Sequence, residues 1–180
     1  QMAQEVADGW ETTPQILVAS PLQRAQETIA PLAQKFNVEV RKDERVIEAE
    51  NKFQGLSDMR SQLRSPKLWP LVLNPFRPSW GEPYLNQVLR VAEAIQDLRD
   101  ELMLTYGPGS SAVVVSHQLP IWVTRLSAEG KRLAHDPRNR QCSLGSVTSF
   151  SFAPGQQVPT VSYAEPVKHL SQRAAALPGA

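Results

Sequence analysis

Two short segments of the sequence combine residue types that can bind an oxyanion. Arg24 lies in Ser20-Pro-Leu-Gln-Arg24, and His117 lies in Ser116-His117-Gln118; each segment follows an apolar run. A helix that begins at such a point offers free N–H groups to an anion, and a guanidinium adds two parallel donors that match phosphate oxygens. The ordinary alternatives are a solvated surface arginine and a buried histidine with satisfied hydrogen bonds.

The elements that position these two residues are short strands followed by helices. Gln15-Ile-Leu-Val-Ala19 and Ser111-Ala-Val-Val-Val115 are apolar runs between turn signals, which predicts two buried strands. Ser20 is expected as the N-cap of the next helix, with Pro21 at its first position. In α/β folds, ligands bind beyond the carboxyl ends of the strands, so both segments are expected to face one crevice.

The rest of the chain continues this alternation. A helix is expected to end near Gly9, the longest helix over 82–106, and a further helix over 119–129. Shorter strands are expected at Val38-Glu-Val40, 143–153 and 158–163. Helices alternating with short apolar strands predict an α/β fold: a three-layer α/β/α sandwich with a mainly parallel central sheet, in which strands 15–19 and 111–115 are adjacent at the centre.

Composition excludes several classes of protein. The 180 residues are typical of one domain, and the net charge of +1 provides no field that would gather nucleic acid or an anionic membrane. No apolar run approaches the roughly 18 residues of a membrane span. The lone Cys142 excludes an intramolecular disulfide and a zinc cluster, and it favours a reducing, cytoplasmic location. The oligomeric state stays open.

Residues 51–80 break the periodic pattern. The segment is rich in proline, yet it is too apolar for a disordered linker. Such a stretch inside a compact domain favours an insertion over the active site, at the carboxyl ends of the strands. The expected organisation is therefore one domain over 1–165 and a loose, alanine-rich tail over 166–180.

Four motifs together resemble a known family. They are Ser20-Pro-Leu-x-Arg24-x-x-x-Thr28, Glu48 shortly before Phe53-Gln-Gly55, Trp80-Gly-Glu82, and Val-Val-Ser116-His117. In this order and spacing they resemble the histidine phosphatase superfamily, also called phosphoglycerate mutase-like, over about residues 1–165. The resemblance implies a phosphatase or mutase acting on a small phosphorylated substrate, with no metal and no other cofactor.

The resemblance also implies a covalent mechanism through a phosphohistidine. Arg24 matches a phosphate-binding arginine of the family, and His117 matches the histidine that binds phosphate and stabilises the transition state. Glu48 matches the usual proton donor; the alternative is a solvated carboxylate at the end of a strand. An imidazole nucleophile divides one difficult displacement into two easier ones, and cations stabilise charge on the transferring oxygens.

One motif of the family is missing from the chain. The first strand and its Arg-His-Gly, which supplies the nucleophilic histidine, are expected ahead of Gln1. His135 lies in a polar loop and His169 in the tail, so neither is expected to replace it, and the 180 residues alone are expected to be inactive. The alternatives are a degenerate, non-catalytic protein that binds phosphate esters, and a domain that uses these residues structurally.

Two further residues are possible substrate contacts. Gln118 stands where the family commonly has a small residue, and it is expected either to narrow the pocket or to offer an amide to the substrate. Glu82 opens the long helix, so it is either a partner of the helix dipole or a site residue. The basic stretch 131–140 either adds charge at the rim or is a solvated loop. The sequence leaves the substrate, and the choice between hydrolysis and mutase transfer, open.

Overall fold

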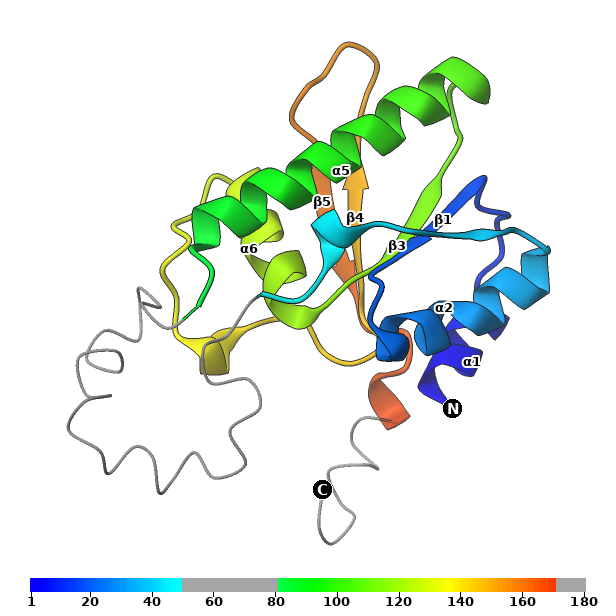
Figure 1. The fold of residues 1–180 in the computed structure, drawn as a ribbon, viewed down its shortest axis with the longest axis horizontal. Helices are drawn as coiled ribbons and strands as arrows, with labels where there is room; N and C mark the ends of the chain where they lie inside the picture. Colours follow the sequence, from blue (N-terminus) through cyan, green and yellow to red (C-terminus); the bar gives the residue numbers. More distant parts are fainter. Residues whose placement is uncertain (50–80, 171–180) are drawn as a thin grey trace, which may run out of the picture.

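A three-stranded parallel sheet organises the computed structural model, which describes residues 1–49 and 81–170 (Figure 1). The proposed insertion 51–80 and residues 171–180 of the expected tail lie outside the described residues. The strand order is β2, β1, β3, where β1 spans Ile16–Ala19, β2 spans Val40–Lys42 and β3 spans Ala112–Val115.

Strand β1 is the most deeply buried element. Its four apolar residues are at most 2% exposed, because it pairs with β2 on one side and with β3 on the other. Leu17 lies opposite both Val40 and Val113. The predicted adjacency of the two apolar runs is therefore confirmed. Among the described strands, however, β3 is at the edge of the sheet and not at its centre.

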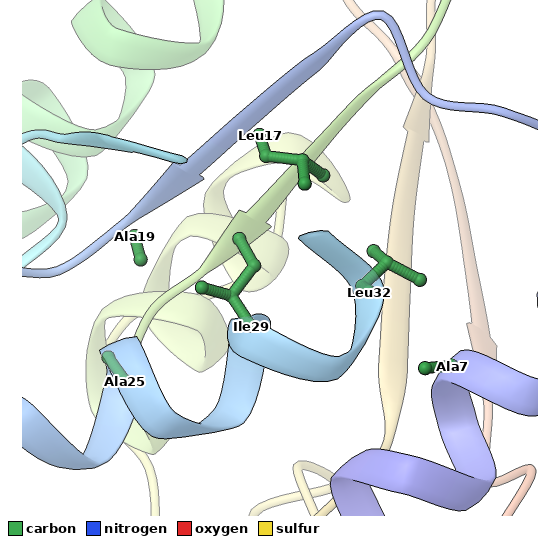
Figure 2. Packing of buried hydrophobic residues seen from close by; sticks show 6 residues of the cluster. All are labelled: Ala7, Leu17, Ala19, Ala25, Ile29 and Leu32. Carbon is green, nitrogen blue, oxygen red and sulfur yellow. The ribbon is translucent and has the colours of Figure 1, made fainter. Parts of the chain in front are cut away.

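Helices cover both faces of this sheet. On one face, Leu17 packs in a cluster with residues of α1 (Met2–Asp8) and α2 (Gln23–Phe36), as Figure 2 shows. On the other face, Ile16 packs with residues of α5 (Tyr84–Thr105). Successive side chains of a strand point to opposite faces, so β1 contributes to both clusters. The predicted three-layer α/β/α sandwich is confirmed.

The start of α2 differs from the expected N-cap. Leu22, with an extended backbone, is the N-cap, and α2 begins at Gln23. Ser20 lies earlier, where its Oγ accepts a hydrogen bond of 3.3 Å from the Leu22 N–H. Ser20 was therefore wrongly predicted as the cap, because its hydroxyl is used in the turn that links β1 to α2. Arg24 still falls in the first turn, as the sequence predicted.

The remaining elements lie close to their predicted positions. The expected strand at 38–40 is found two residues later as β2, and the last two strands form a separate antiparallel pair. Val167 and Leu170 are buried, so packing continues past the expected boundary at residue 165. No helix in the described ranges has the length and hydropathy of a membrane span. The elements not yet given bounds are η1 (Glu44–Val46), α6 (Gln118–Ala128), η3 (Pro137–Asn139), β4 (Val147–Ser151) and β5 (Thr160–Ala164).

Candidate active site

Arg24 and His117 meet at the carboxyl ends of β1 and β3. The Arg24 Nε donates a hydrogen bond of 3.2 Å to the His117 Nδ1, although the residues are 93 positions apart in the sequence. The His117 side chain is 5% exposed and the Arg24 side chain 60% exposed. The pair therefore extends from a buried imidazole at the sheet to a guanidinium open to solvent.

Ser20 fixes the orientation of the His117 ring. Its Oγ lies 2.8 Å from the His117 Nε2, and the serine is fully buried. Because Nδ1 accepts a hydrogen bond from Arg24, the ring proton of a neutral imidazole belongs on Nε2, from which it is donated to Ser20. Ser20 thus holds one ring nitrogen and leaves Nδ1 facing Arg24.

The environment of His117 favours a neutral ring. Burial, together with the positive charges of Arg24 and Arg90, lowers the pKa of His117 from 6.5 to about 4. Desolvation and like charge both oppose a second proton. An anion at Nδ1 would reverse part of this effect, since opposite charge raises the pKa of an imidazole. Arg24 is therefore a cation beside a neutral His117 ring.

Glu48, in the segment after η1, lies close to both Arg24 and His117. Its Oε2 lies 3.9 Å from the Arg24 Nη2 and 3.9 Å from the His117 Nδ1, beyond hydrogen-bonding distance in both cases. Two backbone contacts hold the segment before it: Ser116 Oγ donates to the Val46 carbonyl at 2.7 Å, and Arg90 Nη1 donates to the Arg45 carbonyl at 2.6 Å. The Glu48 carboxylate thus lies near both the Arg24 guanidinium and the His117 ring without a hydrogen bond to either.

The other two predicted contacts have partners within the fold. Both carboxylate oxygens of Glu82 accept hydrogen bonds from Arg90, at 2.9 and 2.8 Å. The Gln118 amide nitrogen donates to the Cys142 carbonyl at 3.1 Å. The structure therefore brings together Arg24, Glu48 and His117, whereas the polar groups of Glu82 and Gln118 are used in holding α5 and the segment before β4.

The other two histidines have partners of their own. His135 stacks on the Tyr84 ring with centroids 5.3 Å apart, and His169 Nε2 lies 2.9 Å from a carboxylate oxygen of Glu5 on α1. Within residues 1–49 and 81–170, no three or more His, Cys, Asp or Glu side chains form a group that could hold a metal ion.

Sequence reasoning missed three residues that position the site: Ser20, Arg90 and Ser116. Ser20 directly follows β1 and Ser116 directly follows β3, so the rule that selected Arg24 and His117 also pointed to both serines. Arg90 lies eight positions after Glu82, about two helical turns, which was the available signal for their ion pair. The hydrogen bond from Arg90 to the Arg45 carbonyl, in contrast, could not be anticipated from the spacing of the two residues.

The fold is of the phosphoglycerate mutase-like class. The family model for the histidine phosphatase superfamily (branch 1) matches residues 1–163, and the chain belongs to that superfamily. A relative in Mycobacterium tuberculosis (strain ATCC 25618 / H37Rv), called Uncharacterized protein Rv0525, is 44% identical over 152 residues, which are 83% of this chain and 72% of the relative.

Solved structures with low sequence identity share the fold. Bacillus stearothermophilus YhfR has a TM-score of 0.72 at 19% identity, over 89% of this chain and 79% of that chain. Phosphoserine phosphatase from Entamoeba histolytica, in complex with 3-phosphoglyceric acid, has a TM-score of 0.70 at 22% identity, over 94% and 83%. Mycobacterial glucosyl-3-phosphoglycerate phosphatase Rv2419c, in complex with VO3, has a TM-score of 0.69 at 19% identity, over 90% and 79%.

Proposed function

We propose that this chain is the main part of a phosphomonoester phosphatase, or of a phosphoglycerate mutase-like phosphotransferase, which works through a phosphohistidine. The observation that carries the proposal is the meeting of Arg24, His117 and Glu48 beyond the carboxyl ends of β1 and β3. Membership of the histidine phosphatase superfamily supports it. The substrate is a small phosphorylated molecule, which is the kind of ligand that the names of two neighbours print.

The reaction divides between a nucleophile upstream of Gln1 and the residues of this pocket. A neutral imidazole nitrogen of the upstream histidine attacks phosphorus, and the bond from phosphorus to the ester oxygen breaks. Glu48 gives its proton to the leaving oxygen. Water, or an acceptor hydroxyl in a mutase, then attacks phosphorus and gives its proton back to Glu48, which frees the histidine. Arg24 and His117 bind the non-bridging oxygens throughout.

The free edge of β3 supports a strand upstream of the chain. All four residues of β3 are apolar but only half-buried, whereas β1 is almost fully buried. Among the described residues, β3 pairs on one side only. Parallel strands are normally covered on both faces, and an apolar free edge invites another strand. A strand there would bring its carboxyl end next to that of β3, beside His117.

The second candidate is a non-catalytic protein that binds phosphate esters. The partners of His135 and His169 favour it, because both rings are engaged away from the pair of Arg24 and His117. Such a protein would bind the anion between Arg24 and His117 and would never form a phosphohistidine. We place either form in the cytoplasm; detection of the native protein in a secreted fraction would contradict this.

The full-length gene product separates the two candidates. Rapid quenching with a labelled phosphomonoester is expected to trap an acid-labile phosphohistidine upstream of Gln1, and p-nitrophenyl phosphate turnover is expected to persist in excess EDTA. A chain without an upstream Arg-His-Gly that binds vanadate but never becomes labelled would establish the non-catalytic alternative. Loss of turnover in EDTA would contradict a mechanism without metal.

A further inference from the structure

Protein groups occupy both ring nitrogens of His117. The Ser20 Oγ lies 2.8 Å from Nε2, and the Arg24 Nε donates a hydrogen bond of 3.2 Å to Nδ1. A guanidinium has donors only, so Nδ1 presents a lone pair to Arg24 and the proton of the neutral ring is on Nε2. The oxygens of an oxyanion also present lone pairs. The neutral ring in this form therefore has no N–H to donate to an anion beside Nδ1.

Two changes of the ring would create a donor at Nδ1. In the first, the ring takes up a second proton from solvent and becomes an imidazolium that still donates from Nε2 to Ser20. In the second, the single ring proton moves to Nδ1, and the Ser20 hydroxyl turns and donates to Nε2. The first change adds a positive charge beside the anion, whereas the second leaves the number of bound protons unchanged.

The charges around His117 favour the first change when an anion binds. Three charged groups face the ring: Arg24 on α2, Arg90 on α5 and Glu48 after η1. Burial, Arg24 and Arg90 lower the pKa of His117 to about 4. An anion that accepts the Arg24 N–H takes the place of Nδ1 as its partner, and its negative charge offsets the two arginines. In a buried site of low dielectric, an anion is held more strongly by a cationic ring than by a neutral one.

We propose that an anion and a proton bind to this site together. Arg24 exchanges its bond to the His117 Nδ1 for a bond to one oxygen of the anion, and Nδ1 takes up a proton from solvent and donates a hydrogen bond to a second oxygen. The proposal rests on the proposed function, since it assumes that the phosphoryl group lies between Arg24 and His117. It adds a regulation of that site: affinity for the anion falls as the pH rises, and loss of the ring proton to solvent favours release of phosphate.

Nitrogen NMR of the full-length protein with labelled histidine tests the proposal at the ring itself. The probe is sulfate, which has the tetrahedral shape of phosphate and carries no proton near pH 5.5. Without sulfate, the ring proton is expected on Nε2; saturating sulfate is expected to protonate both nitrogens of His117. A single proton that has moved to Nδ1 would overturn the proposal in favour of the tautomer change. A ring that sulfate leaves unchanged would overturn it as well.

Calorimetry counts the protons that accompany the anion. The heat of sulfate binding is measured at about pH 5.5 in two buffers of different ionisation enthalpy, and the difference gives the proton uptake. We expect uptake of about one proton per sulfate, and linkage then requires the affinity to fall about tenfold for each pH unit between about 5 and 6. Uptake near zero, with an affinity that does not depend on pH, would contradict the proposal.

Two matched variants assign the proton to one residue. Glu48 lies 3.9 Å from the same ring nitrogen, so its carboxylate is the other group that could take up a proton beside the anion. His117→Gln keeps an amide donor but has no titratable group, and it is expected to bind sulfate without proton uptake. Glu48→Gln is the control, which is expected to keep an uptake of about one proton. Uptake that survives in His117→Gln and is lost in Glu48→Gln would overturn the role of His117.

Failure of this inference is distinguishable from failure of the proposed function. Sulfate that binds in a manner dependent on Arg24, but without a proton on the His117 Nδ1, would overturn the coupled proton alone and leave the phosphoryl site in place. Sulfate that fails to bind, or whose affinity is unaffected by Arg24→Ala, would instead overturn the phosphoryl site, and with it both the proposed function and this inference.

Discussion

The separation between basic side chains and carboxylates differs between two regions of this molecule. Around η1 and α5, arginines lie within hydrogen-bonding distance of their carboxylates. At the candidate active site, Glu48 is 3.9 Å from both Arg24 and His117. A close, bidentate pair uses the donors of the guanidinium, whereas a looser arrangement leaves donors for a ligand. The close pairs are Arg41 with Glu101 at 2.7 Å, Arg45 with Asp97 at 2.6 Å, and Arg90 with Glu82 at 2.8 Å.

The close pairs and the loose group of Arg24, Glu48 and His117 are expected to have different roles. The close pairs join η1, β2 and the segment before α5 to α5, so they hold these elements against the long helix. Among the described residues, the loose group has no close pair of opposite charges. Its hydrogen bonds run from Arg24 to His117, between His117 and Ser20, and from the Ala49 N–H to Glu48. Variants of the close pairs are therefore expected to change stability, and variants of the loose group are expected to change anion binding and turnover.

The largest expected effect is on turnover in Glu48→Gln. A proton donor contributes roughly 10²–10⁴ in rate, so phosphomonoester turnover of the full-length protein is expected to fall by that factor. Vanadate affinity is expected to stay the same or improve, because the variant removes a negative charge beside the anion. Steady-state kinetics and vanadate inhibition measure the two quantities.

Glu44→Gln is the matched control for Glu48→Gln. Glu44 lies in η1, is exposed, and its carboxylate has no hydrogen-bond partner or ion pair among the described residues. The same loss of charge nearby is expected to leave turnover within about twofold. Equal losses in both variants would show that Glu48 acts only through the general field and does not transfer a proton.

Acid is expected to destabilise the fold through His117 before most carboxylates titrate. Because the folded-state pKa, about 4, lies below the unfolded value of 6.5, the unfolded chain binds the extra proton first. The stabilisation is fully present above pH 6.5 and is lost as the pH falls towards 4. Over that window the full shift amounts to about 3 kcal/mol in the free energy of unfolding.

Urea denaturation at several pH values between 7 and 4.5 measures this dependence. His135 contributes in the same direction, since its pKa is also lowered. His117→Gln is therefore expected to reduce the slope of stability against pH without abolishing it. A slope in His117→Gln equal to that of the unmodified chain would contradict a neutral, buried imidazole at residue 117.

Removing Arg24 or His117, the two residues proposed to bind phosphate, is expected to have a smaller effect than Glu48→Gln. Charge-assisted hydrogen bonds to an anion contribute roughly 1.5–3 kcal/mol, so Arg24→Ala and His117→Ala are each expected to weaken vanadate binding about tenfold to a hundredfold. Arg41→Ala is the control, because its guanidinium is already bound to Glu101. Equal effects of Arg24→Ala and Arg41→Ala would remove the distinction between the two regions.

The sequence was sufficient for the features that depend on local pattern. The apolar runs predicted β1 and β3, and the rule for strand ends brought Arg24 and His117 together across 93 positions. The displaced strand β2 and the wrongly assigned Ser20 cap show the limit of that pattern, because a short alternation fits more than one register. The correct predictions, of β1, β3 and the meeting of Arg24 with His117, required no knowledge of tertiary contacts.

The rest depends on contacts between distant segments. Glu82 was a candidate substrate contact through the Trp80-Gly-Glu82 motif, whereas in the structure both of its carboxylate oxygens are bound by Arg90 of α5. The bond from Gln118 to the Cys142 carbonyl depends on the return of the chain after α6. The buried hydrogen bond between Ser20 and His117 likewise joins residues whose spacing carries no signal.

Ser20→Ala tests this buried contact. Without the hydroxyl, the His117 Nε2–H is left buried without its acceptor, which costs about 1–3 kcal/mol. Part of that cost is expected as lower stability and part as reorientation of the ring, seen as a changed ring tautomer in nitrogen NMR and a shifted pH profile of turnover. Ser110→Ala is the control, since Ser110 bonds only to backbone carbonyls beside α5. An unchanged tautomer in Ser20→Ala would show that Arg24 alone orients the ring.

The smallest effect is expected for the pair of Arg41 and Glu101, although its distance of 2.7 Å is among the shortest. The two side chains are 51% and 39% exposed, so water and salt screen their attraction. Exposed pairs typically contribute about 0.2–1 kcal/mol. A double-mutant cycle of Arg41→Ala and Glu101→Ala by urea denaturation is expected to give a coupling energy in that range, decreasing with added salt. A coupling above about 2 kcal/mol would show that β2 depends on this pair for its attachment to α5, and that a close ion pair is strongly stabilising even at the exposed surface.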